Sequence, residues 1–317
     1  MSTSLSNLEL EQTISLLEAL LQEKRAERGR EKWNETDENL LNDAQKLLRG
    51  LQQAKAGELP SYLFSNLDSE HLEAMGINFK GVLYIEKNRS EDLATPGSEF
   101  WTVENVVRQL NLLRATVPLI NASEAEARSI ISPFLFRIVE LSEGRAVLSL
   151  EQAVPSVDVS ELRKSNSLRL SGYIDYIVTL TSHRSVAEMF ITQPNLVNLL
   201  KDDPSLFIFT PKSKDQFLQS HIPQAVEKMY ACARTSMKKV TRAVLSNGWT
   251  WIFIVLKFGD GWAYWQSPEM VSETVGATPI KEISLRAVSQ ICSILKYWVA
   301  HSNQDLESDD YFSYPAD

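Results

Sequence analysis

The sequence predicts an α/β (α+β) protein in which helices flank a mixed sheet and an N-terminal helical hairpin precedes it. Three observations support this class. Leu206–Phe209 is a short unbroken apolar run, which is typical of a strand buried on both faces. An amphipathic helical pattern follows from about residue 215 to 239, where a kink is expected at Pro223. Asn247 and Gly248 then separate two strand-like runs, which indicates a hairpin.

Composition excludes several classes of protein. The chain has 317 residues and is 44% hydrophobic, which is enough for a substantial core. It has no apolar run of membrane-spanning length, and its first residues lack the layout of a secretory signal. We therefore expect an intracellular protein, cytoplasmic or nuclear, without a membrane segment. Cys232 and Cys292 both lie in apolar helical settings, so we expect buried free thiols.

The residue pattern divides the chain into four parts. Residues 1–57 predict a helical hairpin that either packs on the main domain or pairs with a second copy as a coiled coil. Packing is favoured because the heptad pattern is short. Residues 58–118 predict a small α+β segment packed on the main domain, with a strand over 81–87 and a helix capped by Thr102. The main domain covers 119–304, and an acidic tail, expected to be mobile, covers 305–317.

The main domain begins with a helix capped by Ser123, whose first turns carry Glu124 and Glu126. Strands follow over 145–154 and 168–180, and a final helix covers 280–300. In the second strand, strict alternation places Ile174, Tyr176 and Val178 on one side and Asp175 on the other. A carboxylate inside an apolar strand requires a hydrogen-bond partner, a cation or a metal.

Net charge is −9, which argues against a surface that is basic throughout. The distribution is uneven, however: the stretch from Ser205 to Gly248 has seven Lys and Arg against two acids. This predicts either a local basic face or an ordinary solvated helix. The candidate nucleic-acid contacts are Lys214, Lys228, Arg234, Lys238, Lys239 and Arg242.

Five segments together carry a resemblance to one superfamily. They are Gly172-Tyr-Ile-Asp-Tyr-Ile-Val, Phe207-Ile-Phe-Thr-Pro-Lys, Ile222-Pro-Gln-Ala-Val-Glu-Lys-Met-Tyr-Ala, Ala243-Val-Leu-Ser-Asn-Gly and Trp249-Thr-Trp-Ile-Phe. In this order, after a helix with an acid, they resemble the PD-(D/E)xK restriction-endonuclease-like superfamily, and more narrowly the nuclease-like domains of fungal and Crinkler-type effectors. The resemblance covers about residues 120–300 and rests on the order of the features.

The resemblance implies a Mg²⁺-dependent phosphodiesterase site. Asp175 and Glu126, or Glu124, would hold the ion, Lys212 would be the catalytic lysine, and Gln224 would face the site. The chain departs from the pattern at Thr210, where the family has its second acid, because a hydroxyl is a much weaker ligand for Mg²⁺ than a carboxylate.

Two functions therefore remain open. The first is a degenerate nuclease-like domain, a pseudoenzyme without a cofactor, that binds nucleic acid or a protein partner. The second is an active Mg²⁺-dependent DNA endonuclease that uses Asp175 and Lys212 with an acid from the first helix, Glu126 or Glu124, although Glu227 is a further candidate for that acid.

Two structural alternatives also remain. Asp175 and Lys212 would form a buried ion pair that only holds the strands together. The aromatic hairpin residues, Trp249, Trp251, Trp262, Tyr264 and Trp265, would either stack on bases or pack the sheet, and packing is favoured. The sequence does not set the oligomeric state.

Overall fold

A computed structural model of the chain describes residues 13–18, 21, 44–45, 48, 61–63, 69–86, 89, 101–117, 123–160, 167–193, 203, 205–211, 217–275 and 281–315. The chain divides into two compact units, residues 1–61 with 167–169, and residues 62–166 with 170–317. In the first unit residues 13–18 are helical. The rest of the hairpin expected over 1–57 lies mostly outside the described residues.

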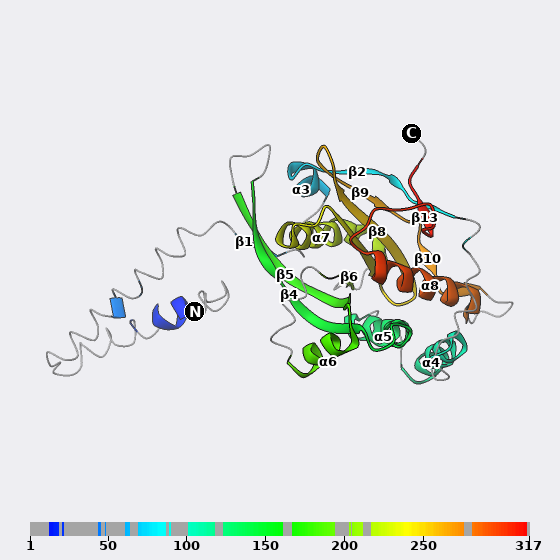
Figure 1. Cartoon of the computed structure of the whole chain (residues 1–317). Coiled ribbons are helices and arrows are strands. Elements are labelled where there is room, and N and C mark those ends of the chain that lie inside the picture. The colour runs from blue at the N-terminus through cyan, green and yellow to red at the C-terminus, as the bar shows by residue number, and fades with distance from the viewer. Residues whose placement is uncertain are drawn as a thin grey trace, which may run out of the picture. The chain divides into compact units, whose positions relative to one another are not determined.

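A nine-stranded mixed sheet forms the centre of the larger unit (Figure 1). Its main path runs β1-β5-β6-β7-β8-β9-β2, while β4 pairs with β5 and β10 with β8. The pairs β6–β7 and β9–β2 are parallel, and β5–β6, β7–β8 and β8–β9 are antiparallel. The strands are β1 (Ser61–Leu63), β2 (Ile77–Val82), β4 (Ala146–Ser160), β5 (Ser167–Leu180), β6 (Ser205–Phe209), β7 (Val240–Ser246), β8 (Thr250–Phe258), β9 (Trp262–Gln266) and β10 (Met270–Val271). This confirms the predicted α/β class.

Two short antiparallel ribbons complete the strands. One pairs β11 (Glu273–Val275) with β12 (Lys281–Ile283). The other pairs β3 (Tyr84–Ile85) with β13 (Phe312–Ser313), which brings a segment near the C-terminus beside one near residue 85.

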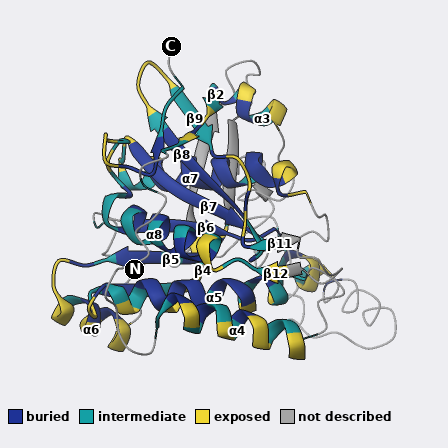
Figure 2. Ribbon diagram, turned by 90° about the vertical axis from the view of Figure 1, so that its right-hand side faces the viewer, coloured by how far each residue is buried: buried dark blue, intermediate teal, exposed yellow. Residues whose placement is uncertain are grey.

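Helices cover both faces of the sheet (Figures 1 and 2). Alternate residues of β8 separate two cores: Phe253 packs in the cluster with α5 and α8, and Ile252 and Ile254 pack in the cluster with α7. Strand β8 is apolar from Trp251 to Leu256 because both of its faces are buried there. The helices are α3 (Ser69–Ala74), α4 (Val103–Thr116), α5 (Glu124–Leu141), α6 (Arg184–Thr192), α7 (Ile222–Ser236) and α8 (Leu285–His301).

Local signals placed several element boundaries correctly. Thr102 caps α4, and Ser123 caps α5 through its hydroxyl, as expected. The hairpin between β7 and β8 turns at Gly248, where φ is +91°. A Cβ added there would lie 2.6 Å from the Cβ of Ile130, so this turn requires glycine both for its conformation and for close packing on α5.

Helix α7 differs from the prediction at both ends. It begins at Ile222, after a 3₁₀ turn over Leu218–His221, and not near residue 215. Pro223 therefore lies in the first turn and makes no kink, because a proline there removes no helical hydrogen bond. The helix ends before Met237, which has a left-handed φ of 52°.

Two other boundaries, and the alternation expected in β5, differ from the prediction. The strand expected over 81–87 is split, with β2 starting at Ile77 and β3 belonging to another ribbon. The last helix starts at Leu285 and not at 280, because β12 pairs with β11 first. In β5 the expected alternation fails at Ile174. This residue packs in the cluster with α7, whereas Tyr176 and Val178 pack in the cluster with α5 and α8.

The acidic tail packs against the sheet over the part that the structure describes, which differs from the expected exposed tail. Asp310 is fully buried and forms an ion pair with Arg242 at 2.7 Å. Phe312 is fully buried in the core, and Asp305 pairs with Lys257. Burial of the tail's aromatic residues, together with these ion pairs, holds the tail against the sheet.

Candidate functional site

Asp175 is buried in β5, and both of its carboxylate oxygens are hydrogen-bonded. Its side chain is 4% exposed. Oδ1 accepts a hydrogen bond from the Arg128 guanidinium at 3.1 Å, and Oδ2 accepts one from the backbone N–H of Thr210 at 2.9 Å. The expectation that this carboxylate needs a partner is met by a guanidinium and a peptide group.

Arg128 joins three acids from three different elements. It lies one helical turn after Glu124 on α5 and binds that residue, Glu151 on β4 and Asp175 on β5. Burial alone lowers the pKa of the Arg128 guanidinium, but the hydrogen bonds to Glu151 and Asp175 and the charge of Glu124 raise that pKa above its usual value. One guanidinium thus serves three carboxylates, which gives the cluster an excess of negative charge.

Thr210 occupies the position at which the resembling family has its second acid. Its backbone holds Asp175, while its hydroxyl is buried and has no hydrogen-bond partner among the described residues. Lys212 and Lys214 lie outside the described residues, so the expected pairing of Lys212 with Asp175 stays a prediction.

Glu126 has a structural contact at the start of α5. Its carboxylate accepts a hydrogen bond from the Ser123 backbone N–H at 2.7 Å, and the Ser123 hydroxyl accepts one from the Glu126 backbone N–H, which makes a capping box. Of the two acids proposed on the first helix, Glu124 is the one that shares Arg128 with Asp175.

The residues around Asp175 do not fit the Mg²⁺ ion that the resemblance implies. A Mg²⁺ site offers carboxylate oxygens to the ion, but here both oxygens of Asp175 face hydrogen-bond donors, one of them a cation. Glu126 is engaged at the helix cap. Within the described ranges, no group of three or more His, Cys, Asp or Glu side chains could hold a metal ion.

Helix α7 places its predicted polar residues in buried or half-buried positions. Gln224 is half-buried in the first turn, and Glu227 is fully buried. Lys228, expected on a basic face, is also buried, with its ammonium group 5.2 Å from the centre of the Phe209 ring.

The predicted basic face is not a continuous surface, which corrects the expectation. Arg242 is 1% exposed and pairs with the buried Asp310, so it cannot reach a ligand at the surface. Lys238 is half-buried and donates to the backbone oxygen of Asp203 at 2.8 Å. Arg234 and Lys239 are exposed.

The aromatic hairpin divides between core and surface. Trp251 is fully buried, whereas Trp262 and Tyr264 are half-buried on the side of the sheet that carries α7. The Tyr264 ring lies 5.3 Å from that of Phe79, which is 50% exposed on the neighbouring edge strand β2. On the same side of the sheet, the Trp262 ring lies 5.3 Å from that of Tyr230, a buried residue of α7.

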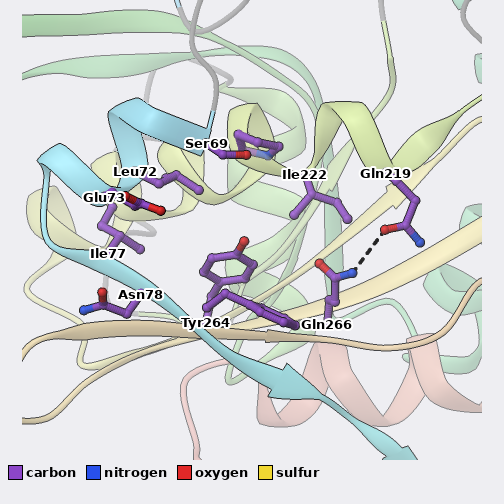
Figure 3. A pocket seen from close by; sticks show the side chains of 11 residues that line it. Ser69, Leu72, Glu73, Ile77, Asn78, Gln219, Ile222, Tyr264 and Gln266 are labelled. Atoms are coloured by element: carbon purple, nitrogen blue, oxygen red, sulfur yellow. Dashed lines mark hydrogen bonds between the residues drawn. The ribbon is translucent and has the colours of Figure 1, made fainter.

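A pocket of about 550 Å³, which no sequence pattern predicts, opens beside Tyr264 (Figure 3). Helix α3, strands β2 and β9, and the start of α7 supply its walls. Its polar side chains are Ser69, Glu73, Asn78, Gln219, Tyr264 and Gln266. They come from distant parts of the sequence, so no local motif marks the pocket.

Comparisons with known proteins place the chain in no family. A scan against protein-family models found no matching family, and a search of curated proteins found no match. Across the described residues, no helix has the length and apolar character needed to cross a membrane.

Proposed function

We propose that this chain is a nuclease-like domain that binds single-stranded nucleic acid and does not cleave it at Asp175. The order α5, β4, β5, α6, β6, α7, β7 supports a PD-(D/E)xK-like arrangement, because the helix with acids, the strand with Asp175 and the helix with Gln224 follow in that order. The observation that carries the proposal is the engagement of both Asp175 oxygens by Arg128 and Thr210.

A guanidinium beside Asp175 takes the place of a metal in the electrostatics of the cluster. It supplies positive charge to the carboxylates, but it offers neither a bound water of lowered pKa nor an open coordination position. Metal-assisted hydrolysis at Asp175 would require Arg128 to leave three acids at once.

Aromatic rings at the sheet edge support single-stranded nucleic acid as the ligand. Phe79 on β2 is 50% exposed with its ring 5.3 Å from that of Tyr264, and Tyr264 and Trp262 on β9 are half-buried. We call these three residues the aromatic edge. Tyr230 on α7 is buried, and its ring packs 5.3 Å from that of Trp262. Bases stack on such rings without the need for a particular sequence.

A cation lies at one end of the aromatic edge. The guanidinium of Arg234, which is exposed, lies 6.0 Å from the ring of Tyr230, the residue that packs on Trp262. A phosphate beside the stacked bases would meet this charge.

Binding and cleavage are tested together with a labelled single-stranded oligonucleotide, by anisotropy at low salt and by gel after incubation with Mg²⁺ or Mn²⁺. We expect binding that weakens as salt rises, and no metal-dependent cleavage beyond that of Asp175→Asn. Phe79→Ala should weaken binding about ten-fold through lost stacking, and Arg234→Glu should weaken it further.

Matched controls exist elsewhere on the surface. Phe136 is 46% exposed on α5, and Arg286 is exposed on α8, so Phe136→Ala and Arg286→Glu should leave binding unchanged. Metal-dependent cleavage that is lost in Asp175→Asn would establish the alternative, an active Mg²⁺ endonuclease. Absence of DNA and RNA binding at low salt would overturn the proposal in favour of a protein partner.

A further inference from the structure

We infer that the pocket beside Tyr264 receives one unstacked nucleobase that carries an exocyclic amino group. The inference rests on the proposed binding of single strands and names the site and the base class within it. The pocket volume, about 550 Å³, lies in the range typical of small-molecule sites.

The charge of the pocket excludes a phosphate as its occupant. None of the described residues that line it is Lys, Arg or His, and Glu73 contributes a carboxylate. An anion would therefore be repelled, whereas a neutral group with N–H donors would be attracted. In Figure 3 the Glu73 carboxylate, the Tyr264 hydroxyl and the Gln266 amide lie around one space.

Two glutamines form a hydrogen-bonded amide pair at the wall. The Gln266 side-chain amino group donates to the Gln219 side-chain oxygen at 3.3 Å. The Gln266 amide keeps its second N–H and its carbonyl oxygen, a donor beside an acceptor, for a ligand. Exchanging oxygen and nitrogen in both amides also leaves a donor beside an acceptor, so the conclusion does not depend on how the amides are oriented.

A donor beside an acceptor matches the edge of a nucleobase. Adenine and cytosine each present an amino group next to a ring nitrogen, and amide side chains read such edges with two hydrogen bonds. Glu73 only accepts hydrogen bonds when ionised, so it favours bases with amino groups over thymine or uracil.

The pocket also offers an aromatic ring and a route to the strand. Tyr264 lines it, and burial raises the pKa of the Tyr264 phenol, so the hydroxyl stays protonated at neutral pH and can donate. Phe79, which also lines the pocket, belongs to the aromatic edge. A base entering the pocket would thus leave its neighbours stacked on that edge, as flipped bases do in other nucleic-acid proteins.

The test uses the full chain and an oligonucleotide of abasic residues that carries a single base at its centre. We expect the oligonucleotides with adenine or cytosine to bind at least about five-fold more tightly than the one with thymine or the fully abasic one. The double variant Gln219→Leu with Gln266→Leu should lose this preference, and Glu73→Gln should reduce the discrimination against thymine.

Gln193→Leu is the matched control, because Gln193 is exposed at the end of α6 and does not line the pocket. Equal binding of all four oligonucleotides, or a base preference that the glutamine variants keep, would overturn the pocket assignment while the proposed function stands. Failure of the wild type to bind any ordinary single strand would instead remove the proposed function itself. Unchanged thermal unfolding of each variant shows that a loss of preference is not a loss of fold.

Discussion

Replacing Arg128 by methionine should destabilise the fold, because it leaves the Asp175 carboxylate buried with only the Thr210 N–H as a partner. Breaking a fully buried ion pair costs about 3–5 kcal/mol. The Arg128 side chain is 30% exposed, which places the expected loss near the lower end, at about 3 kcal/mol.

Asp175→Asn removes the charge but keeps an oxygen for the Thr210 N–H, so we expect a loss of about 2 kcal/mol. The double variant Arg128→Met with Asp175→Asn leaves no buried charge of this pair without its partner. Its loss of unfolding free energy should therefore be about 3 kcal/mol, less than the sum of the losses in the two single variants. The pair would then show a coupling free energy of about 2 kcal/mol.

Urea unfolding of the full chain at neutral pH, followed by tryptophan fluorescence, measures these free energies of unfolding. Arg184→Met is the control, because Arg184 pairs with Glu188 on an exposed helix face and should contribute less than about 0.5 kcal/mol. Additive losses in the double variant, or a cost for Arg128→Met no greater than that for Arg184→Met, would refute the reasoning.

Three further predictions concern the core. Arg242→Met should lower the free energy of unfolding in urea by about 3–5 kcal/mol, because its aspartate partner in the C-terminal segment is fully buried. Gly248→Ala should cost more than about 1 kcal/mol in the same assay, since its φ is +91° and the added methyl would meet α5, whereas Gly259→Ala, with open space around it, should cost far less. Burial raises the pKa of both Cys232 and Cys292 to about 12, so neither thiol should react with a disulfide reagent at pH 8 until the chain is unfolded; fast reaction of the native chain would contradict this.

Features that depend on neighbouring residues were predicted well from the sequence. The caps at Thr102 and Ser123 and the turn at Gly248 each follow from one or two side chains. The apolar run of β6 indicated burial on both faces, and all of its residues are buried. Cys232 and Cys292 are buried free thiols, as their apolar settings indicated.

Features that depend on tertiary partners were not predictable in this way. Arg242 lies in a run of cations in the sequence. In the fold it pairs with Asp310, 68 positions later, and this ion pair brings the tail into the core. The role of Arg128 is not visible in the sequence, because an arginine in a helix turn is ordinarily solvated. Only the convergence of α5, β4 and β5 brings three acids to it.

The same convergence explains why a binding surface at the edge of the sheet is compatible with a closed cluster at Asp175. Arg128 links α5 to β4 and β5, so these ion pairs hold α5 on the sheet. Breaking the ion pairs would lower the free energy of unfolding. The aromatic edge lies on β2 and β9, neither of which contributes a side chain to that cluster. Substitutions at Phe79 should therefore change affinity without changing unfolding, whereas substitutions at Arg128 should change unfolding first, and this separation distinguishes a ligand surface from a structural ion pair in one chain.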